Sequence, residues 1–123
     1  MTQPKFDVLG IGNAIVDIIS RAEDDFLLRH EMRKGGMALI DEARAGAIYE
    51  AMGPAVEISG GSAANTIVGV ASLGGRSAFI GKVKDDELGR AFRHDISAAG
   101  VAFDTPPASA GPSMVSHNRQ LQP

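Results

Sequence analysis

At 123 residues the chain is long enough for one domain with a hydrophobic core, and 44% hydrophobic with 22% charged residues is ordinary for a globular protein. A net charge of −3 without a basic stripe argues against a nucleic-acid partner, and the absence of cysteine excludes disulfides, thiolate metal sites and a cysteine nucleophile. The N-terminus lacks a signal-peptide layout and no apolar run approaches the roughly 20 residues that span a bilayer, so the sequence predicts a cytoplasmic protein without membrane contact.

The first half of the chain alternates apolar strands, glycine-rich turns and helices. Strands are predicted over Phe6–Gly12 and Ile15–Ile19, followed by a short helix over Phe26–Leu28 with Asp24 or Asp25 as its cap. After a turn at Gly35-Gly36 come a short strand over Met37–Ile40 and a helix over Asp41–Met52, which Asp41 caps and Gly53-Pro54 ends.

The second half repeats the alternation more regularly. The expected elements are a strand over Val56–Ser59, a nearly uncharged and mostly buried helix over Ser62–Leu73, a strand over Ser77–Val83 and an amphipathic helix over Asp85–Ala99. Strands that alternate with helices predict parallel βαβ units and an α/β fold. From Asp104 onward four prolines interrupt the pattern, so this tail is expected to be a weak strand around Ser113–Val115, a linker or a frayed end.

The most informative segment is Gly60-Gly61, where an apolar strand ends and the uncharged helix begins. Paired glycines let the backbone approach a ligand closely, and a helix start aims free N–H groups at it. This pattern predicts a polar floor for a small hydroxylated or anionic molecule. The competing interpretation is an ordinary helix start with Ser62 as its N-cap and Asn65 folded back onto the first turn.

Asp17 is the second candidate, because it is an acid flanked by branched apolar residues. Burying such a carboxylate is costly unless it is paired. It accepts up to about four hydrogen bonds, which suits two neighbouring sugar hydroxyls. The alternative is that Asp17 faces water on the polar side of a half-buried strand.

Other candidate motifs carry simpler interpretations. Gly10-Ile11-Gly12 suggests a dinucleotide fingerprint, but a strand rather than a helix is predicted after it, which favours a tight turn between two strands. Asp85-Asp86 is expected to be a cap and a first-turn acid. The three histidines, His30, His94 and His117, have no metal-binding spacing, so no metal ligands are assigned.

Taken together in order, the motifs resemble the start of a ribokinase-like (PfkB-type) carbohydrate and nucleoside kinase, closest to bacterial adenosine-kinase-like members. The matching segments are Gly10-x-Gly12-Asn13 with Asp17, Gly60–Asn65, Leu73-Gly74-Gly75, Phe79–Val83 and Asp85-Asp86-x-x-Gly89. The resemblance runs from about Phe6 to about Pro107 and would cover roughly the first third of a family member's single large domain. It divides the chain into a kinase-type part over 6–107 and an irregular tail over 108–123 where a truncation is expected.

The resemblance implies a three-layer α/β sandwich, present here in part, with a small β-sheet lid formed around Asp17–Ala22 and Val56–Ser59. It implies transfer of the ATP γ-phosphoryl group to a hydroxymethyl of a nucleoside or sugar, with ATP and Mg²⁺ as cofactors of the full-length enzyme. By position, Asp17 would hold ribose hydroxyls, Gly60 and Gly61 would line the sugar pocket, and Asn65 would contact the sugar.

The family's Gly-x-Gly-Asp or Gly-Ala-Gly-Asp catalytic segment and its Asn-x-x-Glu are absent from the sequence. No catalytic residue and no cofactor is therefore assigned to this fragment, which alone is expected to be inactive. Two alternatives stay open: a non-catalytic sugar- or nucleoside-binding or lid-mediated interaction module, and a plain Rossmann nucleotide binder. A sheet cut part-way also predicts self-association through the lid or an exposed edge.

Overall fold

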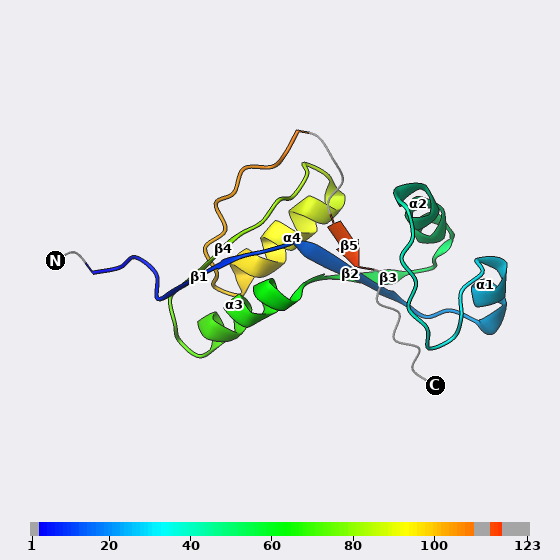
Figure 1. Ribbon diagram of the computed structural model, residues 1–123, viewed down its shortest axis with the longest axis horizontal. Coiled ribbons are helices and arrows are strands. Elements are labelled where there is room, and N and C mark those ends of the chain that lie inside the picture. The colour runs from blue at the N-terminus through cyan, green and yellow to red at the C-terminus, as the bar shows by residue number, and fades with distance from the viewer. Residues whose placement is uncertain (1–2, 110–113, 117–123) are drawn as a thin grey trace. The chain divides into compact units, whose positions relative to one another are not determined.

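The computed structural model describes residues 3–109 and 114–116 (Figure 1). They fall into two compact units, one made of the chain up to Asp17 together with Glu57–Ser116, the other of Ile18–Val56. From β3 onward strands and helices alternate, and β1 and β4 pair in parallel, which confirms the predicted α/β class.

The first unit is organised by a parallel strand pair with a helix against it. Strand β1 (Val8–Ile11) pairs with β4 (Ser77–Ile80), and α3 (Ser62–Ser72) packs on both strands. The close packing depends on two glycines. A Cβ on Gly10 would stand 2.5 Å from Ile67 Cγ1, and one on Gly12 would stand 2.8 Å from Ala63 Cβ. The Gly-x-Gly motif thus lets α3 pack closely on β1. A strand follows the motif, as the predicted turn between two strands requires.

An aromatic cluster forms the core of this unit. Phe79 of β4, Phe92 of α4 (Glu87–Ala98) and Phe103 are buried, with ring centroids 5.4–6.1 Å apart. The amphipathic helix is confirmed: Asp86 caps it by accepting from the Gly89 N–H at 2.7 Å, and Gly100 follows it with φ of 90°. The first-turn acid is Glu87 and Asp85 precedes the helix, which corrects the expectation that Asp85-Asp86 supply both the cap and the first-turn acid. On the strand face opposite Phe79, Leu9, Ile11 and Ile80 are exposed, whereas Ala78 is buried.

The second unit contains two helices and its own small core. Helices α1 (Asp24–Arg29) and α2 (Glu42–Ala51) bury Phe26, Leu27 and Ile48. Arg44 links them, because its guanidinium donates to the His30 carbonyl at 2.7 Å. As predicted, Asp41 is the N-cap of α2, and its side chain accepts from the Arg44 N–H at 2.8 Å.

A three-stranded sheet contains the strands that the resemblance assigns to the lid. Its order is β3 (Ala55–Gly60), β2 (Ile15–Ser20), β5 (Met114–Ser116), with β2 and β5 parallel. Strand β5 is the weak strand that the sequence left open in the tail.

Several local predictions are wrong. Residues 36–40 form no strand; Met37 and Leu39 are about 94–97% exposed, and no described neighbour pairs with this segment. The N-cap of α1 is Glu23, which places Asp24 and Asp25 in the first turn, where the helix dipole favours acids. Strand β4 ends at Ile80 rather than Val83. Helix α3 is less buried than expected, with only Ala64 and Ile67 fully covered.

No helix among the described residues combines the length and apolar character required of a membrane span.

An ion pair fastens the start of β1 to the start of β4. The Asp7 carboxylate accepts from the backbone N–H of Arg76 at 2.8 Å and from its guanidinium at 2.9 Å, while the Asp7 N–H donates to the Arg76 carbonyl at 2.7 Å. The hydrogen bonds from the Arg76 side chain and then its backbone hold the pKa of Asp7 below the ordinary value of 3.8. The ionised form is therefore favoured in the folded protein.

This pair predicts an acid-dependent part of the stability. Because folding lowers the pKa of Asp7, its contribution is present above the unfolded pKa and disappears as pH falls through the folded pKa. Asp7→Asn should lower the thermal midpoint at neutral pH and flatten its fall below pH about 4, measured by circular dichroism. Asp104→Asn is the control, since Asp104 is exposed and has no hydrogen-bond partner among the described residues. A parallel acid profile for Asp7→Asn and wild type would contradict the prediction.

Candidate functional site

The structure places the Asp17 carboxylate directly against Gly60. A Cβ built on Gly60 would stand 3.0 Å from Asp17 Cγ, and closer still to Oδ2. Both residues belong to the same compact unit, at the middle of β2 and the end of β3. Two of the four predicted site residues are therefore in contact, although 42 positions separate them in the sequence.

The surroundings of Asp17 leave its carboxylate free to accept hydrogen bonds. Burial alternates along β2, so Val16, Ile18 and Ser20 are buried while Asp17 is half-buried. Among the described residues no group donates a hydrogen bond to it. A half-buried carboxylate without a donor is costly unless water or a ligand supplies one. Asp17 lies on the less buried face of its strand, as the alternative interpretation had it, but faces Gly60 there.

Gly61 is required for a different reason from Gly60. Its φ is 96°, in the region that side chains rarely adopt, and a Cβ there would stand 3.1 Å from the Asn13 carbonyl oxygen. Gly61 is the N-cap of α3, which corrects the expectation that Ser62 caps the helix. Because glycine has no side chain to cap with, the first N–H groups of α3 are left for another acceptor.

Asn65 lies near the start of α3, on an exposed position. Its backbone N–H donates to the Gly61 carbonyl at 2.8 Å, which closes the first helical turn. Its side-chain amide has no hydrogen-bond partner among the described residues, so the expected fold-back onto the first turn does not occur. The described contacts join Asn65 to Gly61 through the helix but do not join it to Asp17.

Gly12 and Asn13 also lie at the start of α3, although neither was among the site residues predicted from the sequence. Gly12 lets β1 approach the first turn of α3 at Ala63, and the Asn13 carbonyl faces Gly61. Both follow the first strand within the Gly10-x-Gly12-Asn13 motif. The motif was recognised, but only the three-dimensional structure links it to the diglycine about 50 residues later.

Chemically, the region combines acceptors and donors at short range. The Asp17 carboxylate accepts hydrogen bonds, and the uncapped start of α3 offers backbone donors. A molecule with neighbouring hydroxyls can donate to the first and accept from the second. Among the described residues no cluster of histidine, aspartate and glutamate could hold a metal ion.

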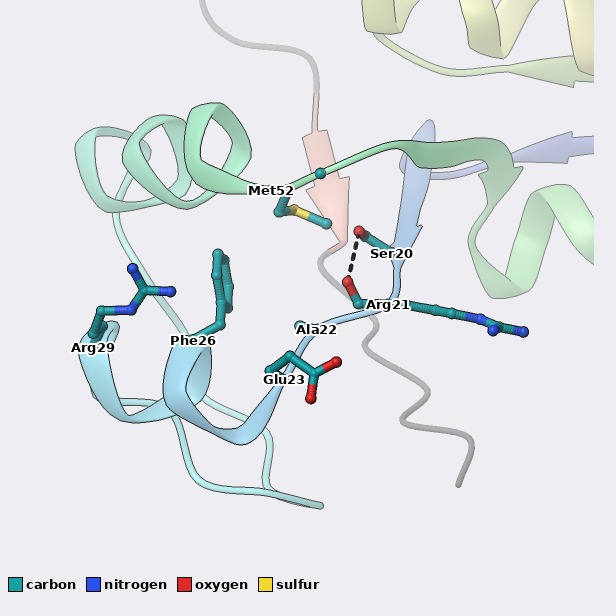
Figure 2. A pocket seen from close by; sticks show the side chains of 8 residues that line it. Ser20, Arg21, Ala22, Glu23, Phe26, Arg29 and Met52 are labelled. Carbon is teal, nitrogen blue, oxygen red and sulfur yellow. Dashed lines mark hydrogen bonds between the residues drawn. The ribbon is translucent and has the colours of Figure 1, made fainter.

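A separate cavity lies within the second unit (Figure 2). It measures about 180 Å³, and Phe26 and Met52 line it beside Ser20. The buried Ser20 hydroxyl donates to the Arg21 carbonyl at 3.2 Å and is within 3.1 Å of the Pro54 carbonyl. None of the four predicted site residues lines this cavity.

Comparisons with known proteins identify the family. Residues 50–111 match the family model described as pfkB family carbohydrate kinase. A probable sugar kinase from Rhizobium etli is similar, with 52% identity and a TM-score of 0.77 over 95% of this chain and 36% of that one. An adenosine kinase from Sinorhizobium meliloti shares 56% identity, with a TM-score of 0.76 over 94% and 36% of the two chains. A fructokinase from Klebsiella pneumoniae is 40% identical over 67 residues, 54% of this chain and 22% of the relative.

The chain belongs to the PfkB family of carbohydrate kinases, and the ribokinase-like architecture implied by its motifs is confirmed. It spans little more than a third of the two solved kinases and about a fifth of the fructokinase.

The contact between Asp17 and Gly60 predicts a coupled pair of substitutions. Gly60→Ala should lower the free energy of unfolding by about 1–3 kcal/mol, because the new methyl group displaces the carboxylate. In an Asp17→Ala background the same change should cost at least about 0.5 kcal/mol less, since the obstructing group is gone. Urea unfolding of the four proteins measures both values.

Gly69→Ala is the matched control for this cycle. Gly69 lies inside α3, and a Cβ there meets no atom within 4 Å, so the change should raise stability by up to about 1 kcal/mol. An equal cost of Gly60→Ala with and without the Asp17 carboxylate would contradict the contact.

Proposed function

We propose that this chain is the N-terminal, substrate-binding part of an ATP-dependent kinase that phosphorylates the hydroxymethyl group of a nucleoside or sugar. The observation that carries the proposal is the half-buried Asp17 carboxylate, which lies against Gly60 and receives no hydrogen bond from the described residues. Membership of the PfkB family supplies the reaction type. The chain's own part in that reaction is to hold and orient the hydroxylated substrate.

In this proposal each site residue has a separate role. Asp17 accepts hydrogen bonds from two neighbouring hydroxyls of the substrate, which fixes the orientation of the sugar ring. Gly60 gives the carboxylate its space, and Gly61 turns the chain so that the N–H groups of α3 face the ligand. Asn65, whose side-chain amide is unpaired among the described residues, adds a polar contact to the sugar near the same helix end.

ATP and Mg²⁺ belong to the whole enzyme in this proposal, and the residues present do not fit a site for them. The sequence contains no Gly-x-Gly-Asp segment, and the described residues form no carboxylate cluster for a cation. No catalytic step is assigned to this chain, which by itself is expected to bind substrate without transferring phosphate. A need for ATP also implies the cytoplasm as the compartment of action.

Adenosine is the first substrate to test and a sugar such as fructose the second. The adenosine kinase from Sinorhizobium meliloti supports the first, and the probable sugar kinase and the fructokinase support the second. The two share the chemistry proposed here, since adenosine and the furanose form of fructose both present neighbouring hydroxyls on a five-membered ring.

The proposal predicts that Asp17 dominates binding. Isothermal titration of the chain with adenosine, fructose and ATP should detect binding of a hydroxylated substrate, and Asp17→Ala should weaken it at least about tenfold through loss of charge-assisted hydrogen bonds. Asp104→Ala, which removes an exposed acid elsewhere, should bind as wild type does.

Two results would count against this function. Binding of ATP without any affinity for adenosine or sugar would favour a nucleotide-binding module. Unchanged substrate affinity in Asp17→Ala would remove the carboxylate from the site.

A further inference from the structure

Asp95 of α4 reaches across to the strand that ends in the diglycine. Its Oδ2 accepts a hydrogen bond from the backbone N–H of Ser59 at 2.9 Å. Ser59 directly precedes Gly60, and Asp95, Ser59, Gly60 and Asp17 all lie in the same compact unit. Among the described strands β3 has β2 as its neighbour and is an edge strand, and the partner of the Ser59 N–H is the Asp95 side chain.

The position of Asp95 within α4 shows that it does not serve the helix. It lies in the last turn, where the negative end of the helix dipole disfavours a carboxylate, and no basic residue in that turn offsets it. Aspartate is also a poorer helix former than leucine or alanine. The side chain is two-thirds buried, and its other oxygen lies 3.6 Å from Nδ1 of the exposed His94. Because the helix itself gains nothing from an acid at position 95, the contact of this side chain with β3 is the better explanation for it.

We infer that Asp95 is a positioning residue. By accepting the Ser59 N–H it keeps Gly60 against the Asp17 carboxylate and Gly61 at the start of α3. A charge-assisted hydrogen bond is stronger than a neutral one, so it restrains an edge strand that few neighbours hold. Glycine has the greatest backbone freedom of all residues, so Gly60 and Gly61 depend on their neighbours to fix their conformation. A hydrogen bond to the residue directly before them is therefore effective. The effect on ligand affinity rests on the proposed function; the effect on the strand does not.

The test replaces Asp95 with leucine, which is similar in size and cannot accept a hydrogen bond. Amide hydrogen exchange by NMR should be about tenfold or more faster at Ser59 and Gly60, while the Phe79 N–H, bonded to the Ala102 carbonyl at 3.0 Å, keeps its rate. Adenosine or fructose affinity should fall about fivefold, as for loss of one hydrogen bond. The thermal midpoint should change little, because removal of a carboxylate that the helix dipole disfavours offsets much of the lost hydrogen bond.

Two further variants make the result specific. Asp95→Asn keeps an accepting oxygen and should restore exchange and affinity to within about threefold of wild type. Asp85→Leu makes the same change at an exposed acid that pairs with Arg90 at 2.9 Å, and it should leave Ser59 and Gly60 unaffected. Asp95→Ala is measured in place of Asp95→Leu if leucine does not fit.

The outcomes separate the two proposals. Faster exchange at all amides together with a lower midpoint would make Asp95 a plain structural residue and overturn the inference, as would unchanged exchange at Ser59 and Gly60. If wild type binds neither adenosine nor fructose, the proposed function fails, and the exchange data still decide whether Asp95 holds the strand.

Discussion

The candidate site depends on one steric and electrostatic constraint. The Asp17 carboxylate occupies the space that a side chain at position 60 would need. Only glycine leaves that space, so the end of β3 and the middle of β2 are matched by shape. The carboxylate is half-buried and has no donor among the described residues. A hydroxylated ligand would donate the missing hydrogen bonds and remove the cost of burying this charge. The packing of Asp17 against Gly60 thus bears directly on binding.

The start of α3 is placed by contacts on both of its sides. On one side, Gly10 and Gly12 let β1 approach Ile67 and Ala63 closely. On the other, the left-handed Gly61 turns the chain from β3 into the helix, next to the Asn13 carbonyl. Glycines that look like separate motifs in the sequence thus act together to bring a strand end, a helix start and one acid to the same place.

Sequence periodicity predicted the elements that bury a clear face. Helix α4 was anticipated because its apolar residues recur at helical spacing, and β2 because branched residues surround a single acid. The contact of Asp17 with Gly60 was implied by family resemblance, not by local pattern. The failures occurred where the local pattern does not decide the structure. Met37–Ile40 has strand composition but no partner strand among the described residues, and the interpretation with Ser62 as N-cap fails because Gly61 occupies that position.

Asp95 could not have been assigned from the sequence, although one signal was present. An acid in the last turn of a helix is opposed by the helix dipole, which marks it as unusual. Its partner is a backbone N–H 36 positions away, and a backbone donor has no sequence signature. A contact between a side chain and a distant backbone group can be assigned only from the three-dimensional structure.

The most direct test of the central claim is a crystal structure of this chain with adenosine or fructose bound. The account predicts neighbouring ligand hydroxyls within hydrogen-bond distance of the Asp17 carboxylate, beside Gly60 and the first N–H groups of α3. A ligand bound elsewhere, or an Asp17 side chain turned away from Gly60, would contradict it.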